Sequence, residues 1–160
     1  MVTFSAGGIR FSYRVGAVVV REGQVLLMRN LAEDYWFTPG GRVEFGETAP
    51  AAVAREMTEE IGAAGRIERL IWVNENFFRL GDTSHHELAL YFLVSLPEAA
   101  HRDFSVRSYC EEAGGSRFEV VWHELEALKT IRLVPGFLTE ALTDLPSTAV
   151  HIVQVDEPAS

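Results

Sequence analysis

The chain has 160 residues, of which 48% are hydrophobic and 23% are charged, and its formal net charge is −9 at pH 7. These values predict one domain, residues 1–160, with a substantial core, and they argue against a nucleic-acid backbone as the main partner. No apolar run is long enough to cross a membrane, and no signal peptide is predicted. The single cysteine, Cys110, excludes an internal disulfide, so we expect a cytoplasmic protein.

Short apolar runs alternate with turn residues along most of the chain. Strands are predicted over residues 13–20, 24–29, 67–78, 85–96, 118–122 and 149–155. Glu22-Gly23 and residues 80–83 are hairpin signals, and residues 36–45 contain two short strands around a glycine loop. The remaining predicted segments are short helices over residues 123–129 and 136–142 and a loop over residues 109–115. A sheet with helices on either face, an α/β fold, is the simplest packing for this order.

Residues 49–61 have the signals of one well-bounded helix. Thr48 is a good N-cap, Pro50 is tolerated in the first turn, and Gly62 is a natural C-terminal stop. At about 100° per residue, three carboxylates fall within about a third of the circumference. They belong to Glu56, Glu59 and Glu60, and they adjoin an apolar stripe formed by Val53, Met57 and Ile61. Because Mg²⁺ and Mn²⁺ prefer oxygen ligands, this face is a candidate metal site.

An acidic helix face by itself is more typical of an ordinary solvated surface, so the flanking residues decide between the two interpretations. Glu47 precedes the helix and Arg55 lies within it, and a guanidinium can orient carboxylates by a bidentate pair. Gly40 and Gly41 form a segment whose backbone can approach a ligand closely. A surface helix needs none of these additional parts, and their presence favours the metal site.

The segment 41–63 resembles the Nudix box of the MutT-like hydrolases, written G-x5-E-x7-R-E-U-x-E-E-x-G-U, where U is a bulky aliphatic residue. Its seven fixed charged and glycine positions are all present, at Gly41, Glu47, Arg55, Glu56, Glu59, Glu60 and Gly62. Met57 is acceptable at the first U position, whereas Ala63 is smaller than usual. The preceding Trp36-Phe37-Thr38-Pro39-Gly40 is similar to the W-x-x-P-G that often leads into the box.

The resemblance implies a Nudix-type α/β/α sandwich around a central mixed sheet. It also implies hydrolysis of a phosphoanhydride with Mg²⁺ or Mn²⁺ as cofactor. By the same resemblance, Glu56, Glu59 and Glu60 are metal ligands, and the backbone carbonyl of Gly40 or Gly41 is a further ligand. Glu56 or another nearby glutamate, such as Glu59, is the base.

The resemblance assigns the two remaining charged positions of the box to supporting roles. Glu47 supports the metal cluster or its helix, and Arg55 orients a glutamate. Dimerisation is common in the family, and residues 1–12 are the candidate contact for a homodimer.

Many members of the family recruit one more acidic residue from outside the box. Glu87, Glu111 and Glu112 are the candidates, although each is individually more typical of an ordinary solvated acid. His85 and His86 are similarly open between a structural and a functional role. The stretch 76–81 lacks the proline and the tyrosine that mark two Nudix substrate classes, and the coenzyme A marker is also missing.

The combined prediction is a Nudix pyrophosphohydrolase that acts on a small molecule, a nucleoside diphosphate linked to another moiety. Nucleic acids and membranes are not expected as partners. Two alternatives stay open: a Nudix-fold sensor that binds a nucleotide without turnover, and a prenyl diphosphate isomerase. The complete set of box carboxylates argues against the first. The second would need a catalytic cysteine, and Cys110 lies far downstream of the box in a predicted loop.

Overall fold

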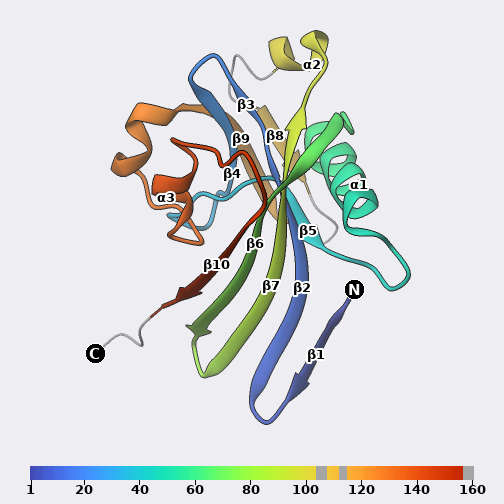
Figure 1. The fold of residues 1–160 in the computed structure, drawn as a ribbon, viewed down its shortest axis with the longest axis vertical. Coiled ribbons are helices and arrows are strands. Elements are labelled where there is room, and N and C mark those ends of the chain that lie inside the picture. Colours follow the sequence, from blue (N-terminus) through green and yellow to red (C-terminus); the bar gives the residue numbers. More distant parts are fainter. Residues whose placement is uncertain (104–107, 112–114, 157–160) are drawn as a thin grey trace.

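The computed structural model describes residues 1–103, 108–111 and 115–156, in which two β-sheets lie between helices (Figure 1). The larger sheet contains β1 (Thr3–Ala6), β2 (Ile9–Val18), β5 (Gly40–Arg42), β6 (Arg66–Leu80), β7 (Thr83–Ser95) and β10 (Val150–Val155). The smaller sheet contains β3 (Val20–Arg21), β4 (Gln24–Asn30), β8 (Ser108–Glu111) and β9 (Arg117–Glu124). The helical elements are α1 (Ala49–Ile61), α2 (Glu98–Asp103), the 3-10 helix η1 (Leu125–Thr130) and α3 (Leu138–Ala141).

The larger sheet is mixed, as predicted. Its strand order is β1-β2-β7-β6-β10, and β5 pairs with the same strand, β2, as β1 does. The pairs β2–β7 and β6–β10 are parallel, whereas β1–β2, β2–β5 and β6–β7 are antiparallel. The smaller sheet has the order β3-β4-β9-β8 and is antiparallel throughout.

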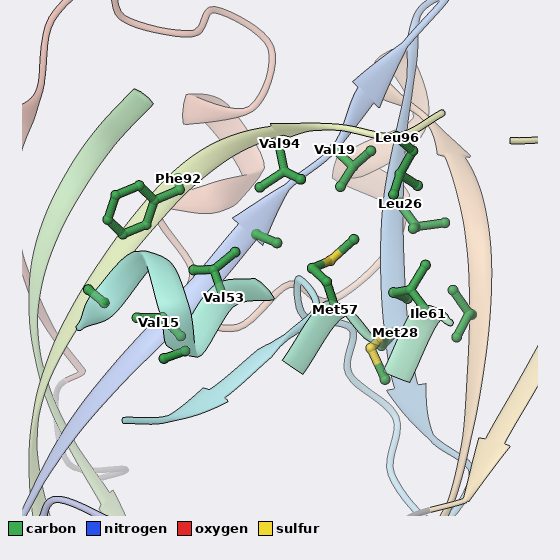
Figure 2. Close-up of a cluster of buried hydrophobic side chains, with 14 of the residues drawn as sticks. Val15, Val19, Leu26, Met28, Val53, Met57, Ile61, Phe92, Val94 and Leu96 are labelled. Atoms are coloured by element: carbon green, nitrogen blue, oxygen red, sulfur yellow. The ribbon is translucent and has the colours of Figure 1, made fainter. Parts of the chain in front are cut away.

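Two buried clusters hold the helices against the sheets. In the first, shown in Figure 2, Val53 and Met57 of α1 pack with Val15 of β2 and Phe92 of β7. The second cluster joins the larger sheet to η1 and α3; its members include Trp72, Tyr91, Leu128 and Leu138. Because successive strand residues face opposite sides, one sheet supplies both clusters. Helices therefore cover both sides, which confirms the predicted α/β/α sandwich.

Most predicted strands and the first hairpin are confirmed. Glu22 and Gly23 have φ values of 50° and 79° and connect β3 to β4 in an antiparallel pair. The predicted strand over residues 13–20 is divided, because β2 ends at Val18 in one sheet and β3 begins at Val20 in the other. This division lets one continuous apolar run contribute to both sheets.

Three local differences from the sequence prediction concern short elements. Residues 109–111 were predicted as a loop, and this is wrong because they belong to β8, which pairs with β9. Strand β1 and helix α2 were not predicted at all, since four and six residues are too few for a clear period.

In the part of the chain that is described, no helix has the length and apolar character to cross a bilayer.

Candidate active site

Helix α1 begins and ends where the sequence predicts. The side-chain oxygen of Thr48 accepts a hydrogen bond from the N–H of Ala51, at 3.4 Å. At the other end, Gly62 has the left-handed φ of 80°, and its N–H donates to the carbonyl of Thr58. These caps satisfy backbone groups that the helix itself leaves unpaired. They hold the box glutamates in one register above β5.

Strand β5 brings Gly40 close to the backbone of β2 and Gly41 close to the carboxylate of Glu56. Gly40 pairs with Gly16 and Gly41 pairs with Val15, so the predicted loop at this point is wrong. A Cβ at Gly40 would lie 2.2 Å from the carbonyl oxygen of Val15, and the φ of Gly40 is 148°. A Cβ at Gly41 would lie 2.2 Å from Oε1 of Glu56. The missing side chains are therefore what allow this strand to approach both β2 and the carboxylate.

Arg55 is the centre of a hydrogen-bond network within the box. Its Nε and Nη2 donate to the two carboxylate oxygens of Glu47, at 2.9 and 3.0 Å. Its Nη1 donates to Oε1 of Glu56 at 2.7 Å and reaches Oε2 of Glu59 at 3.5 Å. Nη2 also donates to the carbonyl of Arg42 in β5, at 3.1 Å. One guanidinium thus ties the helix to the strand and fixes the direction of two carboxylates.

The charges of this network stabilise one another. Hydrogen bonds from Arg55 and from the backbone N–H of Glu44 lower the pKa of Glu47 below its ordinary value. The carboxylates of Glu47 and Glu56 in turn raise the pKa of Arg55 above its ordinary value. Arg55 is consequently a permanent cation beside Glu56 and Glu47. The backbone groups of Arg42 and Glu44 were missed by the sequence analysis, because no side-chain pattern indicates a main-chain partner.

The last two box glutamates differ in their surroundings. Glu60 is only 7% exposed, and its Oε2 accepts a hydrogen bond from the N–H of Gly40 at 2.9 Å. The side chain of Glu59 is 59% exposed and lies at the solvent side of Arg55. Glu56 is closer to the first case, with its side chain 12% exposed. The buried pair, Glu56 and Glu60, therefore lies toward the strand, and Glu59 faces solvent.

The oxygen atoms above β5 suit a divalent cation in their chemistry. Glu56 and Glu60 are one helical turn apart and reach two consecutive residues, Gly41 and Gly40. Carboxylates and backbone carbonyls are the hard ligands that Mg²⁺ and Mn²⁺ prefer. Within residues 1–103, 108–111 and 115–156, no three His, Cys, Asp or Glu side chains are already gathered as a metal-binding group. In this arrangement Arg55 donates a hydrogen bond to Glu56, and the N–H of Gly40 donates one to Glu60.

Among the candidate acids outside the box, Glu87 does not join this network. Glu87 lies on the face of the larger sheet opposite Gly41, as the register of β2 with β5 and β7 shows, and its Oε1 is 3.7 Å from Nη1 of Arg14. Glu111 belongs to β8, and Glu112 lies outside the described residues.

The two candidate histidines also lie away from the box. His85 and His86 stack on neighbouring phenylalanines of β6, at ring distances of 4.7 and 4.3 Å. These contacts pack β7 against β6.

Comparison with known proteins assigns a family. The model of the NUDIX domain matches residues 10–141. A MutT-like protein of Streptomyces ambofaciens is 41% identical over 69 residues, which cover 42% of this chain and 45% of that protein. An RNA pyrophosphohydrolase of Serratia proteamaculans is 38% identical over 66 residues, which cover 41% of this chain and 38% of that enzyme. The chain thus spans less than half the length of these curated relatives.

The fold is shared with solved structures over most of the chain. The MutT protein from Bacillus halodurans superposes with a TM-score of 0.62 at 15% sequence identity, covering 92% of this chain and 91% of that chain. The strand–glycine–helix arrangement of the box and the sandwich around it agree with this likeness. The family match covers most of the described residues, and the chain therefore belongs to the Nudix family.

Proposed function

We propose that this protein is a pyrophosphohydrolase, dependent on Mg²⁺ or Mn²⁺, that acts on a nucleoside diphosphate linked to another moiety. The observation that carries the proposal is the convergence of Glu56 and Glu60 on Gly40 and Gly41, with Arg55 beside them. Members of this family generally use divalent metal ions, and one relative carries the name pyrophosphohydrolase. Both facts agree with the oxygen-rich site.

The residues of the box have distinct tasks in this proposal. Glu56, Glu59, Glu60 and the carbonyl of Gly41 would hold the cation, which supplies charge neutralisation at the phosphate oxygens and a lower pKa for a bound water. Arg55 holds Glu56 in place, and Glu47 in turn holds Arg55 through two hydrogen bonds. The network therefore positions the carboxylates before the substrate arrives.

The hydrolysis itself needs one base and one leaving group. Water attacks one phosphorus in line with the bridging oxygen, the bond from phosphorus to that oxygen breaks, and the bridging oxygen leaves with the second phosphoryl group. Glu56 accepts the proton of the water, and Glu59, which is more exposed, is the second candidate for this base. The products are a nucleoside monophosphate and either the phosphorylated moiety or pyrophosphate.

A panel of nucleoside diphosphate derivatives tests this function. Each compound is incubated with Mg²⁺, with Mn²⁺ or with a chelator, and phosphate-containing products are measured. We expect metal-dependent turnover of at least one compound and its loss in Glu56→Gln and Glu60→Gln. The exposed Glu126 of η1 provides the matched control, since Glu126→Gln changes a carboxylate on another element and is expected to retain activity.

Two results would contradict the proposed function. Undiminished turnover in the presence of the chelator would exclude the metal-dependent mechanism. A fully inert panel, together with a ligand that raises the melting temperature, would favour a sensor instead.

The same proposal includes a homodimer formed through the N-terminal hairpin, where Phe4 and Ile9 are 59% and 48% exposed. A single-chain mass in light scattering would contradict this part alone.

A further inference from the structure

A row of polar side chains crosses the larger sheet on the face opposite the box carboxylates. Ser12 of β2, Glu87 of β7, Asn76 of β6 and Gln154 of β10 are direct cross-strand neighbours. Asn74 lies two residues from Asn76 on the same face. Sheet faces in a protein of this size are normally apolar where they are buried, as the adjoining Trp72 and Tyr91 are. The polar row is therefore unusual for a buried part of a sheet face.

Three members of this row are deeply buried, and in two of these the side-chain oxygen has no hydrogen-bond partner. Ser12, Asn74 and Asn76 are 1%, 0% and 4% exposed. The side-chain oxygens of Asn74 and Asn76 are buried and accept no hydrogen bond. Such unpaired acceptors are rare in folded proteins because they lose their bonds to water without replacement. Two of them side by side indicate that a donor from outside the chain completes the site.

The row reaches solvent at the charged pair of Glu87 and Arg14. The side chains of Glu87 and Arg14 are 16% and 34% exposed, and the closest atoms of the pair are 3.7 Å apart, too far for a direct hydrogen bond. Glu87 thus offers a third acceptor beside the two amide oxygens. Phe137 is an aromatic neighbour of the row. Its N–H donates to Oε1 of Gln154 at 3.1 Å, and the Phe137 ring packs on Tyr91 and Trp72.

The row is also close to the box in the sheet. Arg14 is the cross-strand neighbour of Arg42 in β5, and Gly16 is that of Gly40. Because neighbouring strands are about 4.8 Å apart, β7 and β6 lie on the order of 10 and 14 Å from β5. Gly41 lies under Glu56, while Gly40 is in register with Gly16 on the side of the row. Strand β5 therefore contacts the box carboxylates on one side and borders the face of the polar row on the other.

We propose that Asn76 and Glu87, supported by Asn74 and Ser12, recognise an amino-bearing nucleobase of the substrate. The three acceptors require a ligand with N–H donors, and an exocyclic amino group on a planar ring supplies them. Arg14 turns from Glu87 toward the ligand or solvent when the base binds. The inference rests on the proposed function for the class of ligand, but it assigns specificity to residues outside the box.

Two pairs of nucleotides provide the test: GMP has an amino group that IMP lacks, and CMP has an amino group where UMP has a carbonyl oxygen. Binding of GMP against IMP, and of CMP against UMP, is measured by calorimetry without metal, so that no turnover is needed. We expect the amino-bearing member of at least one pair to bind about tenfold more tightly, which corresponds to one well-made hydrogen bond. Asn76→Leu is expected to abolish this preference, and Glu87→Gln, which loses the charge but keeps one acceptor oxygen, is expected to reduce it.

The matched control is Glu75→Gln, which changes the carboxylate next to Asn76 in sequence but on the other face of β6. It is expected to keep the preference. Equal binding within both pairs by the wild-type protein would overturn the proposal, and so would a preference that survives both row variants. Because the assay needs no hydrolysis, an inert enzyme with an intact preference would refute the proposed function and not this inference. Melting temperatures of the free variants confirm that each one folds.

Discussion

Replacing Gly41 by alanine tests whether the position of the Glu56 carboxylate determines the rate. The added Cβ would lie 2.2 Å from Oε1, 2.4 Å from Cδ and 2.7 Å from Oε2 of Glu56. Ordinary contact begins at 3.4 Å, so the nearest oxygen must move from 2.2 to 3.4 Å, by about 1.2 Å. A displacement of about 1 Å at a reacting group lowers the rate by roughly 100-fold. We therefore expect kcat to fall about 100-fold in Gly41→Ala.

The fold should tolerate the same change, because Gly41 does not have a positive φ. The free energy of unfolding is expected to change by less than about 1 kcal/mol, measured by urea denaturation. Gly136→Ala is the matched control, since its Cβ would meet only Oε1 of Gln154, at 3.9 Å. The control should keep its kcat. If Gly41→Ala also keeps kcat on the preferred substrate, the carboxylate does not need its place above β5, and the reasoning is refuted.

Two further predictions concern Arg55 and Glu47. Arg55→Lys removes the bidentate hydrogen bonds to Glu47, which measure 2.9 and 3.0 Å. We therefore expect kcat to fall about tenfold and the free energy of unfolding to drop by about 1–2 kcal/mol. An unchanged kcat would contradict the positioning role of Arg55. The pKa of Glu47 is lowered in the folded protein, so its contribution to stability is fully present above the ordinary pKa of 4.5 and is lost as pH falls through the lower folded value. Glu47→Gln should therefore remove part of the loss of stability below about pH 4.5, measured by urea denaturation at several pH values, and parallel curves for the two proteins would refute this assignment.

The box helix was predictable because its determinants are local. Thr48, Pro50 and Gly62 define its ends within the segment 48–62, and all three act as the sequence indicates. The helix period alone places the three glutamates on one face of the helix. A sheet with helices on either face was predictable for a similar reason, since most strands have their own apolar pattern, whereas the mixed character of the sheet was implied by the family resemblance. What a local pattern does not contain is the partner of each strand.

The glycines of the box show where local reasoning fails. Gly40 and Gly41 were predicted as a loop, because glycine is a poor strand residue on its own. The structure pairs them with Gly16 and Val15, and at Gly40 the close approach of the β2 backbone makes glycine necessary. The requirement arises from β2, which lies more than twenty residues earlier in the chain. No reading of the box alone could reveal it.

The polar row also depends on contacts between residues that are distant in sequence. Ser12 is far in sequence from Asn76 and Glu87, and each of the three alone resembles an ordinary polar residue in a strand. They become a site only through the parallel register of β2 with β7 and the antiparallel register of β6 with β7. A shift of either register by one residue would turn a member to the other face. Residues that hold the reacting bond can thus be local and recognisable, whereas residues that recognise the rest of the substrate depend on the tertiary pairing. For this chain, the structure therefore adds most to the question of specificity.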